Sequence, residues 1–187
     1  MKPLILASQS PRRKQLLEWA CIPFTVLVSD VEESFPPTMP QDEVPLYLAS
    51  KKARAVQAIC SPDAIILAAD TIVLLQDTIL GKPVHREEAI SMLLSLSGVT
   101  HQVITGVILA KGDRAVTFSQ TTSVTFHSLN LDQIEYYVDH YKPYDKAGGY
   151  AIQEWIGVVG IRSIEGDFYN VMGLPVSSVI HHLHQFQ

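Results

Sequence analysis

Serine and arginine side chains gather where a helix is expected to begin. In the segment Ser8–Arg13, Ser10 is typical of a helix cap and Pro11 of the first helical position. The first turn of a helix has unpaired N–H groups and the positive end of the helix dipole, so hydroxyl and guanidinium groups there favour phosphate binding. The alternative is a capped helix with two solvated arginines, because so short a motif also occurs by chance.

Carboxylates follow two of the expected strands. Asp70 and Thr71 end the buried run Ala64–Ala69, and Glu33 lies in the loop after the strand Phe24–Val28. Ligands of open α/β sheets bind at the carboxyl ends of strands, so Asp70 is suited to be a general base or a magnesium ligand. Glu33 is then a candidate to share the metal. The alternative for Asp70 is a plain turn residue.

Three lysines are further candidates for binding phosphate. Lys51 and Lys52 lie within an expected helix, and Lys82 lies in a Gly-Lys-Pro turn. Each alone is typical of a solvated surface. Combined with the carboxylates, they make up the groups needed for metal-assisted attack on a phosphoanhydride.

Strands must alternate with helices to position these groups. Apolar runs predict strands at 4–7, 24–28, 64–69, 72–75, 78–80, 102–126 (a hairpin broken at 111–113) and 158–164. Amphipathic spacing and caps predict helices at 11–20, 43–59, 86–96, 132–141 and after Pro175. The sequence therefore predicts an α/β fold on a mixed sheet flanked by helices.

Composition limits the classes of protein. With 187 residues and 47% hydrophobic content, the chain is expected to form one domain over residues 1–187. The net charge of −5 argues against nucleic acid or an anionic membrane as a partner. Cys21 and Cys60 have no metal-ligand spacing and are interpreted as reduced core thiols. No run of about 18 apolar residues occurs, so a soluble, cytoplasmic protein is expected.

Six segments together resemble the conserved motifs of the Maf family. They are Leu6–Arg13 (LASQSPRR), Ala69–Val73 (ADTIV), Leu80–Pro83 (LGKP), Leu96–Val103 (LSGVTHQV), Asp145–Gln153 (DKAGGYAIQ) and Tyr169–Pro175 (YNVMGLP). The match is colinear and spans nearly the whole chain, which makes it far more specific than any one motif. His85 departs from the family pattern, in which an acidic residue is common, and is expected to cost the next helix its cap.

The resemblance implies an elongated mixed-sheet α/β fold shared with the inosine-triphosphate pyrophosphatases, usually as a homodimer. It also implies an enzyme that uses Mg²⁺, Mn²⁺ or Co²⁺ to hydrolyse a nucleoside triphosphate to the monophosphate and pyrophosphate. The implied roles are proton acceptor for Asp70, metal ligand for Glu33 and Asp70, phosphate binding for Ser8, Arg13, Lys52 and Lys82, and substrate specificity for Arg12, Thr71 and Gln153.

Gln153 sets the expected substrate. Its amide has a donor and an acceptor that match the edge of uracil or thymine. The Ile-Gln pair also resembles the dTTP and UTP branch of the family, which indicates a house-cleaning pyrophosphatase connected with cell-division arrest. The alternatives are a non-catalytic regulator of septum formation and a purine pyrophosphatase acting on 7-methyl-GTP or ITP.

Two further features stay open. His181, His182 and His184 are interpreted as solvated residues rather than metal ligands. Trp155 either stacks on a base or fills the core.

Overall fold

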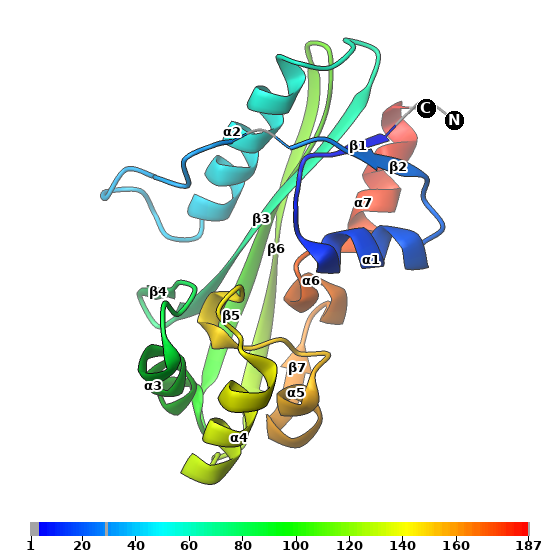
Figure 1. Ribbon diagram of the computed structural model, residues 1–187. Coiled ribbons are helices and arrows are strands. Elements are labelled where there is room, and N and C mark those ends of the chain that lie inside the picture. The colour runs from blue at the N-terminus through cyan, green and yellow to red at the C-terminus, as the bar shows by residue number, and fades with distance from the viewer. Residues whose placement is uncertain (1–3, 29, 187) are drawn as a thin grey trace. The chain divides into compact units, whose positions relative to one another are not determined.

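The computed structural model describes residues 4–28 and 30–186, which form one mixed sheet with flanking helices (Figure 1). The sheet order is β2-β1-β3-β5-β6-β7, with β4 paired to β3. Strand β1 is parallel to β2 and β3, whereas β4 is antiparallel to β3 and β7 is antiparallel to β6. The predicted mixed sheet is therefore confirmed.

The elements follow the expected order as far as α4, and helices α5 and α6 are additions that the sequence patterns did not predict. The strands are β1 (Leu4–Leu6), β2 (Phe24–Val26), β3 (Ile65–Leu75), β4 (Thr78–Leu80), β5 (Thr100–Lys111), β6 (Arg114–Phe126) and β7 (Ile161–Glu165). The helices are α1 (Pro11–Trp19), α2 (Val44–Gln57), α3 (Arg86–Leu96), α4 (Leu131–Tyr141), α5 (Trp155–Gly160), α6 (Phe168–Met172) and α7 (Val176–Leu183). Short 3₁₀ turns occur at Ala147–Gly149 and His184–Phe186. None of the helices in the described ranges has the length and apolarity to cross a membrane.

The chain forms two compact units. The first comprises Met1–Thr71, Thr105–Gln120 and Gly173–Gln187, and the second comprises Ile72–Ile104 and Thr121–Met172. Strands β3, β5 and β6 contribute residues to both units without a linker. That one domain spans residues 1–187 stays a prediction.

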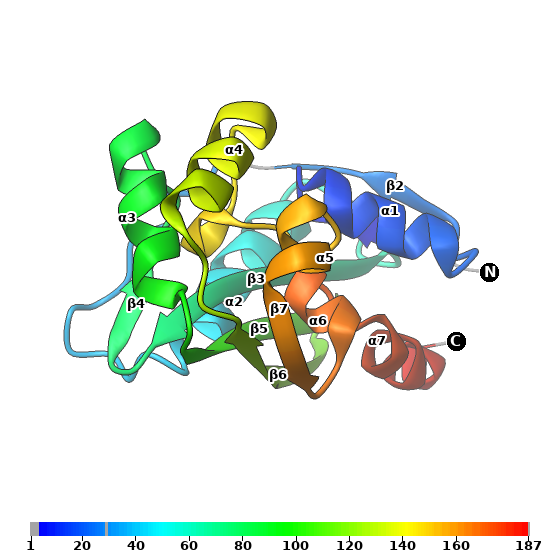
Figure 2. The same ribbon diagram turned by 90° about the horizontal axis from the view of Figure 1, so that it is seen from below.

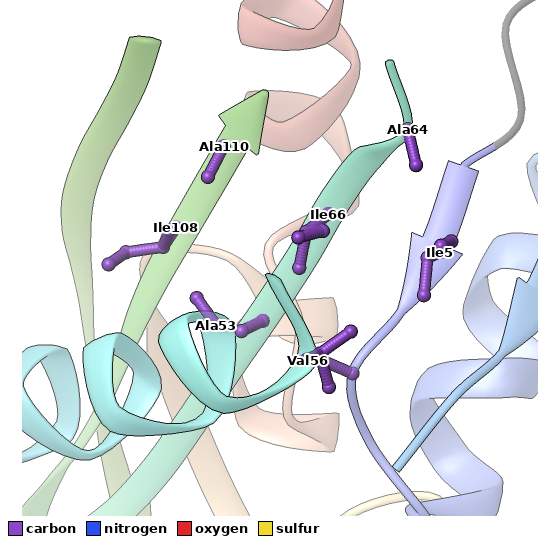
Figure 3. Close-up of a cluster of buried hydrophobic side chains, with 9 residues drawn as sticks. Ile5, Ala53, Val56, Ala64, Ile66, Ile108 and Ala110 are labelled. Atoms are coloured by element: carbon purple, nitrogen blue, oxygen red, sulfur yellow. The ribbon is translucent and has the colours of Figure 1, made fainter. Parts of the chain in front are cut away.

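The core of the first unit lies between helix α2 and the sheet (Figure 3). Ala53 and Val56, one helical turn apart, pack against Ile5 of β1, Ile66 of β3 and Ile108 of β5. At Gly106 of β5, an added Cβ atom would lie 2.2 Å from the backbone nitrogen of Leu46. Only glycine therefore allows the start of α2 to approach the sheet this closely.

In the second unit, helices α3 and α4 lie side by side in both views (Figure 1, Figure 2). The guanidinium group of Arg86 joins them, with Nε 2.6 Å from Asp139 Oδ1 and Nη2 3.3 Å from Glu135 Oε1. His85 does cap α3, because its Nδ1 accepts the Glu88 N–H at 3.3 Å. The expectation that this histidine costs the helix a cap is wrong, since an unprotonated imidazole nitrogen is also an acceptor.

Three other sequence expectations need correction. Strand β3 does not end at Asp70 but continues to Leu75, so the predicted strands 64–69 and 72–75 are one strand, and its end forms the predicted hairpin with β4. Residues 158–160 belong to α5 rather than to a strand; the Val158 N–H donates to the Glu154 carbonyl, so helical pairing overrides β-propensity there. Cys21 is exposed with a φ of 53°, and Cys60 is half-buried against the core, so the cysteines are free but Cys21 is not a core residue.

Candidate active site

The pleat of strand β3 sends two neighbouring polar side chains to opposite faces of the sheet. Successive side chains of a strand alternate between faces, so Asp70 shares a face with Ile66 and Ala68, which pack against α2. Thr71 then points to the other face, where it meets Arg13 of α1. Strand β3 therefore contributes one residue to each of two polar groups in the first unit.

The first group, here called the carboxylate cluster, consists of Glu33, Lys52 and Asp70. The ammonium nitrogen of Lys52 lies 2.5 Å from Asp70 Oδ1 and 2.6 Å from Glu33 Oε1. Asp70 is buried, whereas the Glu33 side chain is 49% exposed. Because both carboxylates bind the same ammonium group, they converge on one point although they come from a strand and a loop.

Lys51 holds the loop that carries Glu33. Its ammonium nitrogen donates to the backbone oxygens of Glu32 at 2.7 Å and Ser34 at 3.0 Å, and to Ser34 Oγ at 3.4 Å. It also lies 5.8 Å from the centre of the Tyr47 ring. The residues on both sides of Glu33 are thus bound to helix α2.

The second group, here called the guanidinium cluster, consists of Ser8, Arg13, Thr71 and Gly173. Arg13 donates from Nη1 to Ser8 Oγ at 3.2 Å, from Nη2 to Thr71 Oγ1 at 3.0 Å and from Nε to the Gly173 oxygen at 2.8 Å. These bonds use three of the five N–H groups of a guanidinium. Arg13 is buried, and its burial lowers the pKa of the guanidinium group, while the negative charge of Asp70 opposes that shift.

Local structure explains how this cluster forms. The last bond from β1 to β3 is donated by the Ala7 N–H to the Leu67 oxygen at 2.8 Å, whereas β3 continues to Leu75. Ser10 caps α1 by accepting the Arg13 N–H at 3.5 Å. Helix α1 therefore begins beside the part of β3 that carries Thr71. Gly173 has a backbone φ of 117°, which residues other than glycine rarely adopt. This conformation turns the Gly173 carbonyl toward Arg13.

The predicted site residues are thus placed in different ways. Ser8, Arg13 and Thr71 meet in one cluster, and Glu33, Lys52 and Asp70 meet in the other. Arg12 is half-buried on α1 next to Arg13. Thr71 bonds to Thr105 Oγ1 at 2.9 Å as well as to Arg13, so its hydroxyl contacts are made within the protein.

Lys82 and Gln153 are exposed residues of the second unit, and Gln153 follows the buried residues Ala151 and Ile152. The turn of Lys82 is held by Gly148, whose N–H donates to the Gly81 oxygen at 2.9 Å. Trp155 is the first residue of α5 and is half-buried, with its ring centre 4.8 Å from that of Tyr136. The roles assigned to Lys82 and Gln153, like those of the other site residues, stay predictions.

The carboxylate cluster fits a divalent metal that also binds a phosphate. Within residues 4–28 and 30–186, no group of three or more His, Cys, Asp or Glu side chains is arranged to hold a metal, and the C-terminal histidines form no such group. Mg²⁺, however, is commonly bound by one or two carboxylates together with phosphate oxygens and water. Glu33 and Asp70, which converge on Lys52, match that smaller requirement.

Comparison with known proteins identifies the family. The model of the family described as "Maf-like protein" matches residues 3–186. The chain belongs to the Maf family. This confirms the resemblance that the six sequence motifs indicate.

Relatives of this Maf chain are similar over nearly their full length. It is 50% identical over 184 residues to a dTTP/UTP pyrophosphatase of Parabacteroides distasonis, covering 98% of this chain and 95% of the relative. It is 52% identical over 180 residues to a dTTP/UTP pyrophosphatase of Cytophaga hutchinsonii, covering 96% and 82%. Among solved structures, the Staphylococcus aureus Ham1 protein is 17% identical with a TM-score of 0.46, covering 67% of this chain and 72% of that one.

Two residues that contribute to the clusters of this Maf chain, Lys51 and Gly173, were not among the predicted site residues. Lys51 stood out only as a charge beside Lys52, because its contacts are with backbone oxygens that carry no sequence signal. Gly173 lies within a recognised motif, and its position before Leu174-Pro175 was the available signal for a special backbone conformation.

Proposed function

We propose that this chain is a nucleoside triphosphate pyrophosphatase that hydrolyses dTTP, UTP and modified pyrimidine nucleotides to the monophosphate and pyrophosphate. The observation that carries the proposal is the carboxylate cluster, in which a buried aspartate is bound by a lysine that also holds Glu33. Relatives about half identical to this chain carry the name dTTP/UTP pyrophosphatase, which supports the same activity.

Asp70 acts as the general base in this proposal. It accepts a proton from water as the water oxygen bonds to the α-phosphorus and the bond from that phosphorus to the bridging oxygen breaks. Pyrophosphate leaves with the bridging oxygen. Lys52 fixes the position of the Asp70 carboxylate through the 2.5 Å contact with Oδ1, and a fixed base needs little reorganisation before the proton transfer.

Phosphate oxygens are bound by cationic groups. Arg13, buried with its terminal nitrogens oriented by Ser8 and Thr71, is a preorganised donor for phosphate, and Lys52 and Lys82 add positive charge. When bound, a divalent cation such as Mg²⁺, Mn²⁺ or Co²⁺ supplies neutralisation of phosphate charge, and Glu33 and Asp70 are the residues that would hold it.

Choice of base is assigned to Gln153, with Arg12 and Thr71 as further specificity residues. The Thr71 hydroxyl accepts a hydrogen bond from Arg13 Nη2 at 3.0 Å. We expect Gln153→Glu to lower kcat/KM for dTTP and UTP sharply, because an acceptor-only side chain cannot pair with both the carbonyl and the imide N–H of the base. Steady-state kinetics with dTTP and GTP check this, and an unchanged dTTP-to-GTP ratio would remove Gln153 from the base site.

The decisive experiment is a substrate panel. Purified protein with Mg²⁺ is incubated with dTTP, UTP, GTP, ITP and 7-methyl-GTP, and both products are resolved. Release of pyrophosphate and monophosphate mainly from dTTP and UTP supports the proposal. Preference for a purine would indicate the purine enzyme of the same fold, and inactivity on all five would favour a binding role in septum formation. Light scattering of the same sample tests the expected homodimer.

A further inference from the structure

The turn that carries Gln153 is bonded at both ends to one buried hydroxyl group. Tyr137, on helix α4, is fully buried. Its hydroxyl oxygen accepts the Ala151 N–H at 3.1 Å, and its hydroxyl proton is donated to Glu154 Oε2. The Glu154 N–H donates to the Ala151 oxygen at 3.1 Å, which closes the turn. Gln153 lies between these two anchored residues and is exposed.

The second carboxylate oxygen of Glu154 is also occupied. Lys146 places its ammonium nitrogen 3.5 Å from Glu154 Oε1 and 2.7 Å from Asp145 Oδ1. Lys146 is a buried residue, so this charge lies in an environment where ion pairing is stronger than in water. Because each oxygen of Glu154 has its own partner, the carboxylate and the backbone that bears it have one orientation.

Helix α4 is a rigid support for the hydroxyl group. Its first turn carries a capping box, in which Asn130 Oδ1 accepts the Gln133 N–H at 2.9 Å and Gln133 Oε1 accepts the Asn130 N–H at 3.0 Å. Its last turn bonds to α3 through Arg86 and Asp139. A hydroxyl on such a helix holds its position better than one on a loop.

From this geometry we propose that Tyr137 is a positioning residue for substrate choice, whose hydroxyl fixes the turn from Ala151 to Glu154 so that the Gln153 amide meets the edge of the base. The proposal rests on the proposed function, in which Gln153 recognises uracil or thymine. An amide distinguishes bases only if its donor and acceptor are held in the matching order and direction, and an unanchored turn loses that order.

The test is Tyr137→Phe, which removes only the hydroxyl oxygen. We expect the ratio of kcat/KM for dTTP to that for GTP to fall about tenfold or more, because small misplacements of a recognition group have effects of that size. The loss is expected mainly in KM for dTTP, with kcat changed less, since the phosphate-binding residues are untouched. Amide exchange at Ala151 should become faster.

Two further variants separate positioning from general structural damage. Tyr141→Phe is the matched control, because Tyr141 stacks on Tyr137 at 5.0 Å on the same helix and its variant leaves the Tyr137 hydroxyl intact. Its dTTP-to-GTP ratio should equal that of the wild type. In a Gln153→Ala background, Tyr137→Phe should change the ratio no further, since it acts through Gln153.

The outcomes are distinct. The role of Tyr137 is overturned if Tyr137→Phe leaves the dTTP-to-GTP ratio of kcat/KM unchanged. It is also overturned if Tyr137→Phe lowers this ratio as much in the Gln153→Ala background as in the wild type. Either result leaves the pyrophosphatase function standing. Wild-type protein that hydrolyses no triphosphate overturns the proposed function and this role with it. If Tyr137→Phe does not fold, Glu154→Ala replaces it, because it releases the other end of the turn and must lower the same ratio.

Discussion

At the scale of single residues, the two faces of strand β3 carry the proposed general base and a residue that contacts the proposed phosphate-binding arginine. Asp70 points toward Lys52, and Thr71, its neighbour, points toward Arg13. A substitution at either position therefore disturbs a different set of partners. This makes it possible to separate proton transfer from phosphate binding by mutation.

Asp70→Asn is expected to remove turnover while leaving nucleotide binding largely intact. The amide keeps the shape of the side chain but cannot accept the proton from water, and loss of a general base costs about 10² to 10⁴ in rate. Single-turnover kinetics and titration with a non-hydrolysable triphosphate analogue measure the two quantities. Turnover within about threefold of wild type would assign the base to another residue.

Alanine variants of Arg13, Lys52 and Lys82 are expected to lower kcat/KM by a similar factor for every triphosphate. Phosphate contacts are the same for all bases, so their loss leaves the ranking of substrates unchanged. The substrate panel described above measures that ranking for each variant. A variant that reorders the bases would place its residue in the base pocket instead.

At the scale of elements, helix α2 positions both the lysine and the loop of the carboxylate cluster. Lys52 reaches the carboxylates, and Lys51, next to it, binds the backbone on both sides of Glu33. The loop has no strand or helix of its own between Asp30 and Pro36. Its conformation near Glu33 therefore depends on contacts with α2.

Lys51→Met is expected to loosen this loop and to lower kcat/KM about tenfold for all triphosphates, because Glu33 is no longer held in place. Hydrogen exchange of residues 31–35 should become faster in the same variant, independently of turnover. Lys51→Arg keeps hydrogen-bond donors at this position, so its kcat/KM and its hydrogen exchange at residues 31–35 should both stay close to those of the wild type. Unchanged exchange in Lys51→Met would show that other contacts hold the loop.

At the scale of the whole molecule, a buried histidine makes stability depend on pH. Only 2% of His101 is exposed, its Nε2 lies 2.6 Å from the Tyr150 hydroxyl, and in the described part of the chain its Nδ1 has no hydrogen-bond partner. Burial lowers the pKa of His101 to about 4 from its ordinary 6.5. Between these values the unfolded chain takes up a proton that the folded chain does not.

The free energy of unfolding is therefore expected to fall as the pH drops from 6.5 to 4, by about 3 kcal/mol for this group. Urea unfolding at pH 7 and pH 4 measures the change. The His101→Gln variant retains a hydrogen-bond partner for Tyr150, but glutamine does not titrate. The free energy of unfolding of this variant should therefore fall less between pH 7 and pH 4. His127→Gln, at an exposed histidine, is the control and should follow the wild type.

The family, and the elements from β1 to α4 in their order, could be predicted from the sequence, whereas helices α5 and α6 could not. The predicted elements depend on local signals: Ser10-Pro11 begins α1, the periodicity of residues 86–96 matches α3, and the Gly112-Asp113 turn joins β5 to β6. Apolar spacing and caps act over a few residues, so they can be read directly along the chain. The six motifs identified the family for the same reason, since each is a continuous segment.

Which charged groups meet depends on how distant segments of the chain pack together. Lys52 is separated by 18 residues from Asp70 and by 19 from Glu33, and Arg13 by 160 residues from Gly173. Strand β3 runs through Asp70 without a break, whereas the apolar pattern indicates two separate strands there. Tyr137 has the ordinary spacing of a core residue, and its hydroxyl partners come from a separate turn. Contacts between distant segments follow from packing, and no local pattern encodes them.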